Sequence, residues 1–221
     1  MVDREQDRYT RYLQDIKQGY DEIAGKYRQQ KDNHQIQVPP FQQLLEVVVA
    51  EDWPRIIELG CGSGYPVATR LLEESCDYTG VDLSTQQISL ARAAHPEFSR
   101  LFVEQDLLTY LREQETATAD IIISLFTIFH LPRERHIDLF IEIRRVLKTG
   151  GLMLITIAPY GEESSEDDFF GATMHWSQFS TRLYRQLLAE LGFIERHFFL
   201  DSHQFMGEEE RICYLLLQKQ E

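Results

Sequence analysis

The segment from Ile56 to Pro66, IIELGCGSGYP, constrains the fold more than any other part of the chain. Its short apolar run favours a buried strand, and three glycines follow at alternate positions, Gly60, Gly62 and Gly64. Glycine permits a sharp turn and lets a ligand approach the backbone closely. Pro66 has the fixed φ that suits the first residue of a helix. The segment therefore predicts a strand, a glycine turn and a helix that together form a nucleotide-type binding site.

The spacing of these glycines differs from the dinucleotide-binding fingerprint. GxGxG is present, whereas GxGxxG would need a glycine where Tyr65 stands. A pyrophosphate is therefore disfavoured here. The carboxylate of Glu58, just before the turn, suits a cationic ligand group better than a phosphate. The alternative interpretation is a structural tight turn in some other α/β protein.

Two stretches resemble a known family. ELGCGSG looks like the glycine motif of class I S-adenosylmethionine-dependent methyltransferases, of the small-molecule branch that includes methyltransferase types 11 and 25. RRVLKTGGLMLI is similar to the same family's helix, turn and fifth strand. The resemblance covers about residues 36–218, and it implies S-adenosyl-L-methionine as cofactor and S-adenosyl-L-homocysteine as product.

The hydrophobic pattern alternates between strands and helices, which is typical of an α/β protein. Together with the resemblance, it predicts a doubly wound, Rossmann-like sheet of seven strands, mostly parallel with an antiparallel last strand, and helices on both faces. The expected strands are 56–59, 78–83, 101–104, 119–124, a fifth after Gly150 and Gly151, 193–200 and 211–218. The expected helices are one opening at Pro39 and those over 67–76, 85–94, 107–113, 137–147 and 180–191.

The first thirty residues are charged but carry apolar and aromatic residues at helical spacing. These residues would line one face: Tyr9, Tyr12, Leu13, Ile16, Tyr20, Ile23, Ala24 and Tyr27. We expect one or two amphipathic helices, broken near Gly19 or Gly25. The stretch YDEIAGKY, Tyr20 to Tyr27, is similar to the N-terminal cap of small-molecule methyltransferases, which lies over cofactor and acceptor. The alternative is that these tyrosines only dock the helix to the body of the protein.

The resemblance divides the chain into an N-terminal helical cap, residues 1–35, and a methyltransferase domain, residues 36–221. Residues 160–176 interrupt the alternation of strands and helices where the family inserts substrate-specific elements. The aromatic cluster of Phe169, Phe170, His175 and Trp176 favours a lid over the acceptor pocket. The acidic run in the same segment favours a solvated loop instead.

Acidic residues end the second and third expected strands. Asp82 stands where a nucleoside ribose would present two hydroxyls, and a carboxylate can accept a hydrogen bond from each. The alternative role, a carboxylate at the start of the next helix, is weakened because Ser84 and Gln87 already make a capping box there. Asp106 resembles the family residue that accepts from the adenine amino group, and it equally suits an ordinary helix cap.

The resemblance assigns the cofactor site to residues at the ends of the first four strands. They are Glu58, Gly60, Cys61, Gly62, Gly64, Asp82, Leu83, Gln105, Asp106, Leu107, Ser124, Leu125 and Phe126. Leu83 and Leu107 would pack on the adenine, while the residues from Ser124 to Phe126 would lie near the methionine part of the cofactor.

A general base would help if the methyl acceptor is an amine or a hydroxyl. His130 matches a histidine often seen after the fourth strand in the small-molecule branch, and a reference pKa of about 6.5 suits proton removal at neutral pH. Tyr20 and His175 are the other candidates. The alternative for His130 is a histidine that only bonds backbone groups at a strand-to-helix junction.

Composition restricts partners and location. A formal charge of −14 disfavours long nucleic acid and anionic membranes, because both normally bind to clusters of lysine and arginine. Three cysteines without metal-type spacing, and no recognisable signal peptide, indicate a cytoplasmic protein. The seven histidines are scattered, so we expect no metal site.

The expected function is transfer of a methyl group to a small-molecule acceptor by in-line displacement, which depends mainly on positioning. An enzyme that uses the same cofactor for another kind of transfer is an alternative, and the identity of the acceptor would distinguish it from a methyltransferase. A nicotinamide dehydrogenase is disfavoured by Tyr65. A noncatalytic S-adenosylmethionine-binding or partner protein that retains the fold is the alternative of a different class, and the full set of motif residues argues against it.

Overall fold

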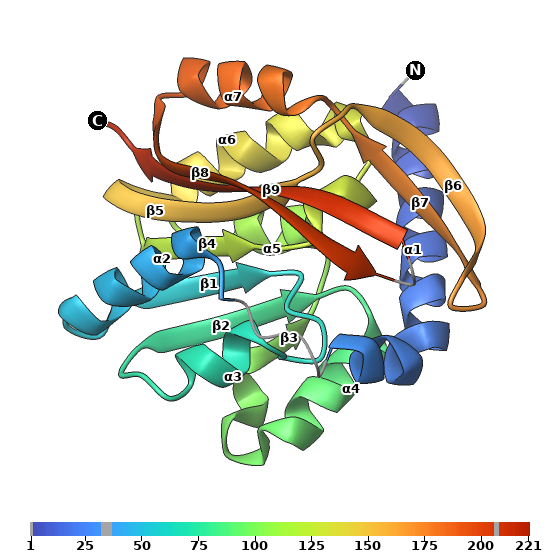
Figure 1. Ribbon diagram of the computed structural model, residues 1–221, viewed down its shortest axis with the longest axis horizontal. Coiled ribbons are helices and arrows are strands. Elements are labelled where there is room, and N and C mark those ends of the chain that lie inside the picture. Colours follow the sequence, from blue (N-terminus) through green and yellow to red (C-terminus); the bar gives the residue numbers. More distant parts are fainter. Residues whose placement is uncertain (1, 32–36, 206–207) are drawn as a thin grey trace.

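A seven-stranded sheet runs through the centre of the computed structural model, which describes residues 2–31, 37–205 and 208–221 (Figure 1). Its strands are β1 (Arg55–Leu59), β2 (Asp77–Asp82), β3 (Phe102–Glu104), β4 (Ala119–Ser124), β5 (Leu147–Ile157), β8 (Phe193–Phe205) and β9 (Glu208–Lys219). The spatial order is β3-β2-β1-β4-β5-β9-β8. Strands β1 to β5 pair in parallel, and β9 is inserted antiparallel between β5 and β8. The predicted fold class is confirmed.

Helices cover both faces of the sheet. They are α2 (Pro39–Ala50), α3 (Val67–Leu71), α4 (Thr85–Ala94), α5 (Leu107–Glu113), α6 (His136–Val146) and α7 (Thr181–Glu190), with short 3-10 turns at Pro96–Leu101, Ile128–His130 and Arg133–Arg135. Buried residues of α5, α6 and α7 form one hydrophobic core with the sheet, and those of α2, α3 and α4 form a second core with the opposite face. The arrangement is doubly wound.

Strand β1 shows why the first strands of the sheet have nearly continuous apolar sequences. Its side chains alternate between the two cores: Ile57 and Leu59 pack toward α5 and α6, whereas Ile56 packs toward α2 and α3. A parallel strand covered on both faces must be apolar at nearly every position. Glu58 therefore has a special position, because the alternation directs it to the same buried face as Ile56.

The N-terminal helix and a two-stranded sheet form a third, separate cluster at one side of the main sheet (Figure 1). Helix α1 (Val2–Lys31) is continuous, so the expected break near Gly19 or Gly25 is wrong. A Cβ at Gly19 would lie 2.9 Å from the sulfur of Met174, so close packing against the small sheet explains this glycine. The small sheet comprises β6 (Glu162–Phe169) and β7 (Ala172–Gln178).

Other boundaries also differ from expectation. Helix α3 ends at Leu71, five residues before the predicted end, and the expected first helical residue, Pro66, lies just before it after a cis peptide bond. Helix α6 ends at Val146, and β5 begins at Leu147 rather than after the glycine pair. Helix α4 and strand β4 have the predicted bounds. The expected linker at 31–38 and the turn around Gly207 lie largely outside the described residues.

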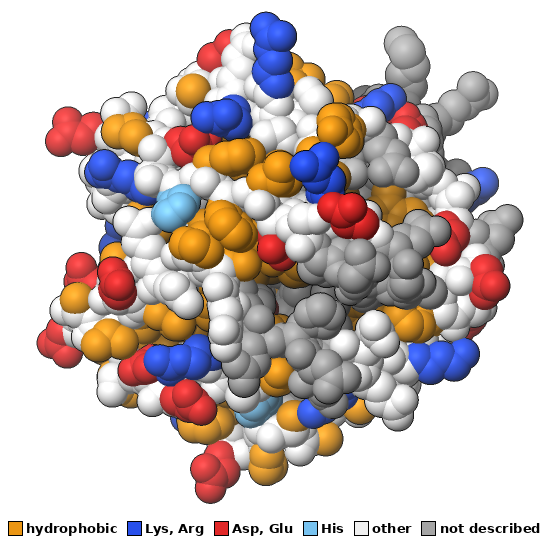
Figure 2. Space-filling view, in the orientation of Figure 1, with side chains coloured by type: hydrophobic (Ala, Val, Ile, Leu, Met, Phe, Trp, Pro, Cys, Tyr) orange, Lys and Arg blue, Asp and Glu red, His pale blue; other side chains and the backbone are white. Residues whose placement is uncertain are grey.

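Charges of both signs are interspersed on the face shown in Figure 2. Within the described ranges, no helix is both long and apolar enough to cross a membrane. The predicted cytoplasmic location and the absence of nucleic-acid binding stay predictions, and so does the boundary between cap and domain.

Candidate functional site

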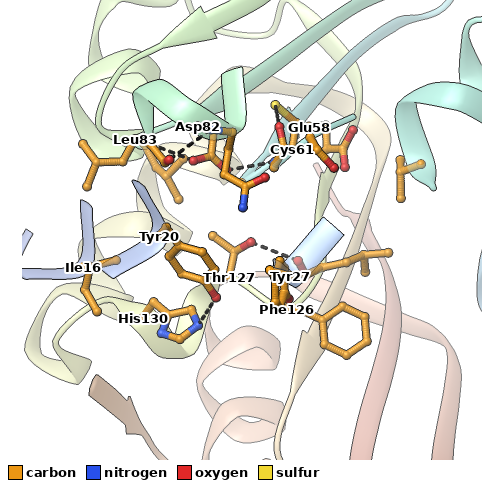
Figure 3. A pocket seen from close by; sticks show the side chains of 18 of the residues that line it. Ile16, Tyr20, Tyr27, Glu58, Cys61, Asp82, Leu83, Phe126, Thr127 and His130 are labelled. Atoms are coloured by element: carbon orange, nitrogen blue, oxygen red, sulfur yellow. Dashed lines mark hydrogen bonds between the residues drawn. The ribbon is translucent and has the colours of Figure 1, made fainter. Parts of the chain in front are cut away.

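A cavity of about 190 Å³ lies where the parallel strands end, and helix α1 forms its opposite wall (Figure 3). Most of the predicted cofactor residues line it: Glu58, Gly60, Cys61, Gly62, Asp82, Leu83, Asp106, Leu107, Leu125 and Phe126. Two of the predicted catalytic residues, Tyr20 and His130, line it as well. The carboxyl edge of such a sheet is where ligands bind in open α/β folds.

Three predicted cofactor residues lie outside this lining and have structural contacts instead. A Cβ at Gly64 would lie 3.2 Å from the ring of His95, so this glycine accommodates a close neighbour. The side-chain amide of Gln105 donates to Glu113 at 3.1 Å. The hydroxyl of Ser124 is buried and donates to the carbonyl of Leu59 at 3.1 Å, which ties β4 to the end of β1.

The glycine turn is held in a left-handed conformation by its neighbours. Gly60, Gly62 and Gly64 have φ values of 78°, 52° and 77°, which only glycine adopts freely. The N–H of Gly60 donates to the carbonyl of Val81 at 2.7 Å, so the turn is fixed to the end of β2. A Cβ at Gly60 would lie 2.0 Å from Oγ1 of Thr127, in the segment after β4. The turn is therefore packed between two strand ends as well as facing the cavity.

Asp82 connects the turn to the next helix. Its Oδ2 accepts from the N–H of Gly62 at 2.8 Å, and its Oδ1 accepts from the N–H of Ser84 at 2.9 Å. Burial raises the pKa of this carboxyl, and the two backbone hydrogen bonds oppose that rise. The helix cap of α4 is Ser84, whose hydroxyl accepts from the N–H of Gln87 at 3.1 Å. Each carboxylate oxygen of Asp82 keeps a lone pair that ligand hydroxyls can use.

Asp106 caps helix α5, as one of its two interpretations predicted. Its Oδ1 accepts from the backbone N–H of Thr109 at 2.9 Å and from the hydroxyl of the same residue at 2.8 Å. Its Oδ2 accepts from the hydroxyl of Tyr9 in α1 at 3.1 Å. Because Asp106 also lines the cavity, the capping role and a ligand contact are compatible.

Glu58 is the most deeply buried acid of the cavity, with 5% of its surface exposed. Its Oε2 accepts a short hydrogen bond from the hydroxyl of Tyr78, which is also buried. Burial raises the pKa of Glu58 to about 8, although the bond from Tyr78 lowers it. The side chain is therefore mostly protonated at neutral pH, and a bound cation would favour its charged form.

The raised pKa of Glu58 makes stability depend on pH. The folded protein holds this proton up to about pH 8, whereas an unfolded glutamate loses it near pH 4.5. The contribution of Glu58 to the free energy of unfolding is therefore fully present below pH 4.5 and is lost as the pH rises toward 8. Between pH 6.5 and 7.5, we expect the wild type to lose about 1 kcal/mol relative to Glu58→Gln. Urea unfolding of the ligand-free proteins at both pH values measures the difference, and parallel pH slopes would contradict it.

Tyr20 and His130 contact one another on the same wall of the cavity (Figure 3). The Nδ1 of His130 is 2.9 Å from the carbonyl oxygen of His175, which can only accept, so Nδ1 carries a proton. Burial lowers the pKa of His130 to about 4, so the ring is neutral at pH 7. Its Nε2 then accepts from the hydroxyl of Tyr20, 2.7 Å away.

The ring of His175, the third predicted base, is not among the residues that line the cavity. It packs against Tyr12, with the ring centroids 5.2 Å apart, and its Nε2 is 3.6 Å from Oδ2 of Asp15. His175 contacts His130 through its backbone carbonyl. The structure therefore gives His175 a role in orienting His130.

Polar contacts fix α1 over the cavity. The ammonium of Lys17 is 3.1 Å from Oδ2 of Asp21 and 3.3 Å from Oε1 of Glu104, at the end of β3. Oδ1 of Asp21 accepts from the hydroxyl of Ser84 at 2.6 Å and from the N–H of Gln86 at 3.0 Å. The helix is thus bonded to the start of α4, next to the predicted cofactor residues.

Sequence reasoning missed several lining residues: Lys17, Tyr65, Gln87, Thr127, Asp201 and Tyr214. Lys17 could have been found, because it lies on the helix face that carries Leu13 and Tyr20. Asp201 and Tyr214 come from the long strands β8 and β9, and nothing local marks them as lining a cavity.

The comparisons with known proteins agree with this geometry. Residues 56–151 match a family model described as a methyltransferase domain. A SAM-dependent methyltransferase from Methanosarcina mazei has a TM-score of 0.64 at 16% identity, covering 80% of this chain and 97% of its own. The [4+2]-cyclase SpnF has a TM-score of 0.67 at 15% identity, covering 92% and 94%. No curated protein matches the chain in sequence.

A third similar structure was solved with ligands. Haemonchus contortus phosphoethanolamine N-methyltransferase 2, in complex with phosphomonomethylethanolamine and S-adenosylhomocysteine, has a TM-score of 0.59 at 18% identity. The match covers 82% of this chain and 53% of that one. At such identities the likeness concerns the fold.

A doubly wound sheet with an antiparallel strand inserted beside β8, and a cavity at the carboxyl ends of its strands, defines a class I methyltransferase fold. Residues 56–151 match the methyltransferase-domain model, and the resemblance of the chain to the class I S-adenosylmethionine-dependent methyltransferases is confirmed. The presence of a cyclase among the similar structures means that the fold alone does not define the reaction.

Proposed function

We propose that this protein is an S-adenosylmethionine-dependent methyltransferase that acts on a small-molecule acceptor. The observation that supports it best is one cavity with acidic side chains and a glycine turn on one wall, and a neutral histidine with a tyrosine on the other. S-adenosylmethionine would supply a methyl group on a positively charged sulfur. The residues of the first wall fit it, and those of the second suit an acceptor.

The chemistry of the donor and acceptor groups supports the cofactor. Glu58 can regain its negative charge beside a bound cation, because burial, with a smaller contribution from the charge of Asp82, is what keeps it protonated. Asp82 offers free lone pairs to the ribose hydroxyls beside the glycine turn. Leu83 and Leu107 provide apolar surface for the adenine, next to the carboxylate of Asp106. Leu125 and Phe126 would lie near the methionine part.

The pair of Tyr20 and His130 supports an acceptor that loses a proton. Nε2 of His130 is unprotonated at neutral pH and its ring is oriented by a backbone carbonyl, so it can accept a proton, although the lowered pKa makes it a weaker base than the free imidazole expected from the sequence. The hydroxyl of Tyr20 occupies that nitrogen in the ligand-free protein. An acceptor hydroxyl or amine that replaces Tyr20 at Nε2 would give its proton to His130. The ring of His175, predicted as a further base, lies outside the cavity lining and is not included in the proposal.

The alternative is a noncatalytic protein that binds the same cofactor. The position of Asp82, bonded to the glycine turn and facing the cavity, would be the same in both cases. The Tyr20 and His130 pair favours the enzyme, since cofactor binding alone gives no reason to hold a neutral histidine at the far wall.

The first test is calorimetric titration of the purified protein with S-adenosylmethionine and S-adenosylhomocysteine, with NAD as control. We expect micromolar binding of the first two and no binding of NAD, because Tyr65 replaces the third glycine of the dinucleotide fingerprint. A screen of small amines, phenols and carboxylates for methyl transfer would follow. Well-folded protein that binds neither sulfur ligand would reject the proposal, and binding without any turnover would favour the noncatalytic alternative.

The proposed base has a defined tautomer that nuclear magnetic resonance can detect. At pH 7, ¹⁵N spectra of the imidazole rings should show His130 neutral with the proton on Nδ1, titrating near pH 4. His136 is a matched internal control: its Nε2 faces the carbonyl of Leu131 and its Nδ1 faces the hydroxyl of Tyr184, so its proton belongs on Nε2. Tyr20→Phe assigns the His130 signal. A charged His130 at pH 7, or the same tautomer for both histidines, would contradict the geometry.

A further inference from the structure

Gln87, a residue that lines the cavity, has an unpaired hydrogen-bond donor. It lies in the first turn of α4, lines the cavity and is only 2% exposed. Within the described part of the chain, its side-chain nitrogen Nε2 is buried and has no hydrogen-bond partner. Buried amides are normally paired, so an unpaired one beside a cavity points to a partner that arrives with the ligand.

The surroundings of Gln87 indicate which part of the ligand it meets. A Cβ at Gly62 would lie 3.8 Å from Oε1 of Gln87, so the amide lies close to the glycine turn. The N–H of Gly62 donates to Oδ2 of Asp82 at 2.8 Å. The amide of Gln87 and the carboxylate of Asp82 therefore both lie close to Gly62, and both residues line the same cavity.

These two groups have complementary hydrogen-bonding chemistry. An ionised carboxylate only accepts, whereas an amide nitrogen only donates. A hydroxyl can do both, and it can give its proton to Asp82 while it accepts from Gln87. A vicinal diol, as on a ribose, has two such hydroxyls and suits a site with an acceptor and a donor side by side.

We propose that Nε2 of Gln87 is a specificity-determining donor to a ribose hydroxyl of the bound nucleoside. The proposal rests on the proposed function and adds to it a residue that selects ribose over deoxyribose. In the ligand-free protein the donor stays unpaired, which lowers stability, and ligand binding pairs it. Gln87 thus gives up stability of the free protein in favour of affinity.

The test compares Gln87→Met, which keeps length and apolar volume but removes the donor, with the exposed neighbour Gln86→Met as control. The probes are S-adenosylhomocysteine and its 2′-deoxy and 3′-deoxy analogues, titrated by calorimetry. We expect Gln87→Met to bind S-adenosylhomocysteine about tenfold more weakly, as for the loss of one ligand hydrogen bond. We expect its melting temperature without ligand to be equal to or above that of the wild type. Gln86→Met should match the wild type in affinity.

The deoxy analogues identify the hydroxyl. With the analogue that lacks the partner hydroxyl, wild type and Gln87→Met should bind equally. Unchanged affinity of Gln87→Met for S-adenosylhomocysteine, or the same loss with both analogues, would overturn the inference and leave the proposed function intact. Wild type that does not bind S-adenosylhomocysteine would overturn both. Gln87→Leu, which also removes the donor, should bind more weakly too and covers the case in which the methionine variant fails to fold.

Discussion

Gly60→Ala is expected to destabilise the protein by roughly 2–5 kcal/mol and to abolish cofactor binding. Two costs add at this residue. Its φ of 78° is unfavourable for alanine, and the new Cβ would lie 2.0 Å from Oγ1 of Thr127, far inside a van der Waals contact. Removing this clash would require the glycine turn to shift, and the shift would disturb the hydrogen bond from the N–H of Gly62 to Asp82. Urea unfolding and calorimetric titration with S-adenosylhomocysteine measure the two effects.

Two further variants test this explanation. Gly25→Ala is the matched control, because Gly25 lies inside helix α1 and its Cβ would meet nothing within 4 Å. It should raise stability by about 0.5–1 kcal/mol, since alanine has the higher helix propensity. Thr127→Ala, added to Gly60→Ala, should restore part of the loss, because it removes the contacts with Oγ1 and Cγ2. The Cβ of residue 127 would still lie 2.7 Å away, and the strained φ would remain. Equal stability of Gly60→Ala and wild type would mean that the turn is not packed as described.

Asp82→Ala should weaken binding of S-adenosylmethionine by roughly 10- to 100-fold and lower stability by about 2 kcal/mol. The variant removes the acceptor for two backbone N–H groups, those of Gly62 and Ser84, and leaves them unpaired in a buried turn. It also removes the proposed acceptor for the ribose hydroxyls. Asp82→Asn should be nearly as impaired, because an amide can present only one oxygen to the two donors.

A control on the same strand separates charge from position. Asp77 begins β2 at the end away from the cavity and is exposed, so Asp77→Asn removes a charge without touching the turn. Its affinity and stability should equal those of the wild type. If Asp82→Ala retained wild-type affinity by calorimetry, Asp82 would be only a structural residue of the turn.

Elements with strong local signals could be predicted from the sequence. Helix α4 has a serine cap at Ser84 and ends just before Pro96, so its limits depend on neighbouring residues alone. Strand β4 could be predicted for the same reason, because its nearly continuous apolar run is a local signal. The proposed cofactor aspartates could be predicted because Asp82 ends β2 and Asp106 lies two residues after the end of β3.

Boundaries set by tertiary packing could not be predicted in this way. Leu147 is fully buried and would suit the last turn of a helix, but it pairs with Ala119 and begins β5. Gly19 reads as a helix breaker, yet it only makes room for β7. The acidic residues of β6 hide its strand pattern, because pairing with β7 and not alternation of side chains defines it.

Within the site, the missing information was the pairing of distant residues. Tyr20 and His130 were each predicted to be candidates, but a sequence gives no sign that residues 110 positions apart share a hydrogen bond. The unpaired amide of Gln87 is equally invisible, because the sequence predicts only its part in the capping box.

The cover of the cavity has a core of its own. Ile16 and Ile23 of α1 pack with Phe169, Ala172 and Met174 of the small sheet, in a cluster distinct from the two that hold the main sheet. Side chains in this cluster can therefore change together without repacking the part of the protein that carries the glycine turn. In terms of the proposed function, a related protein could keep the glycine turn and take up a different acceptor by exchanging α1, β6 and β7, provided that the bonds of α1 to Ser84, Glu104 and Asp106 are retained. The same division suggests where hybrid proteins could be joined, between the cluster of α1, β6 and β7 and the main sheet.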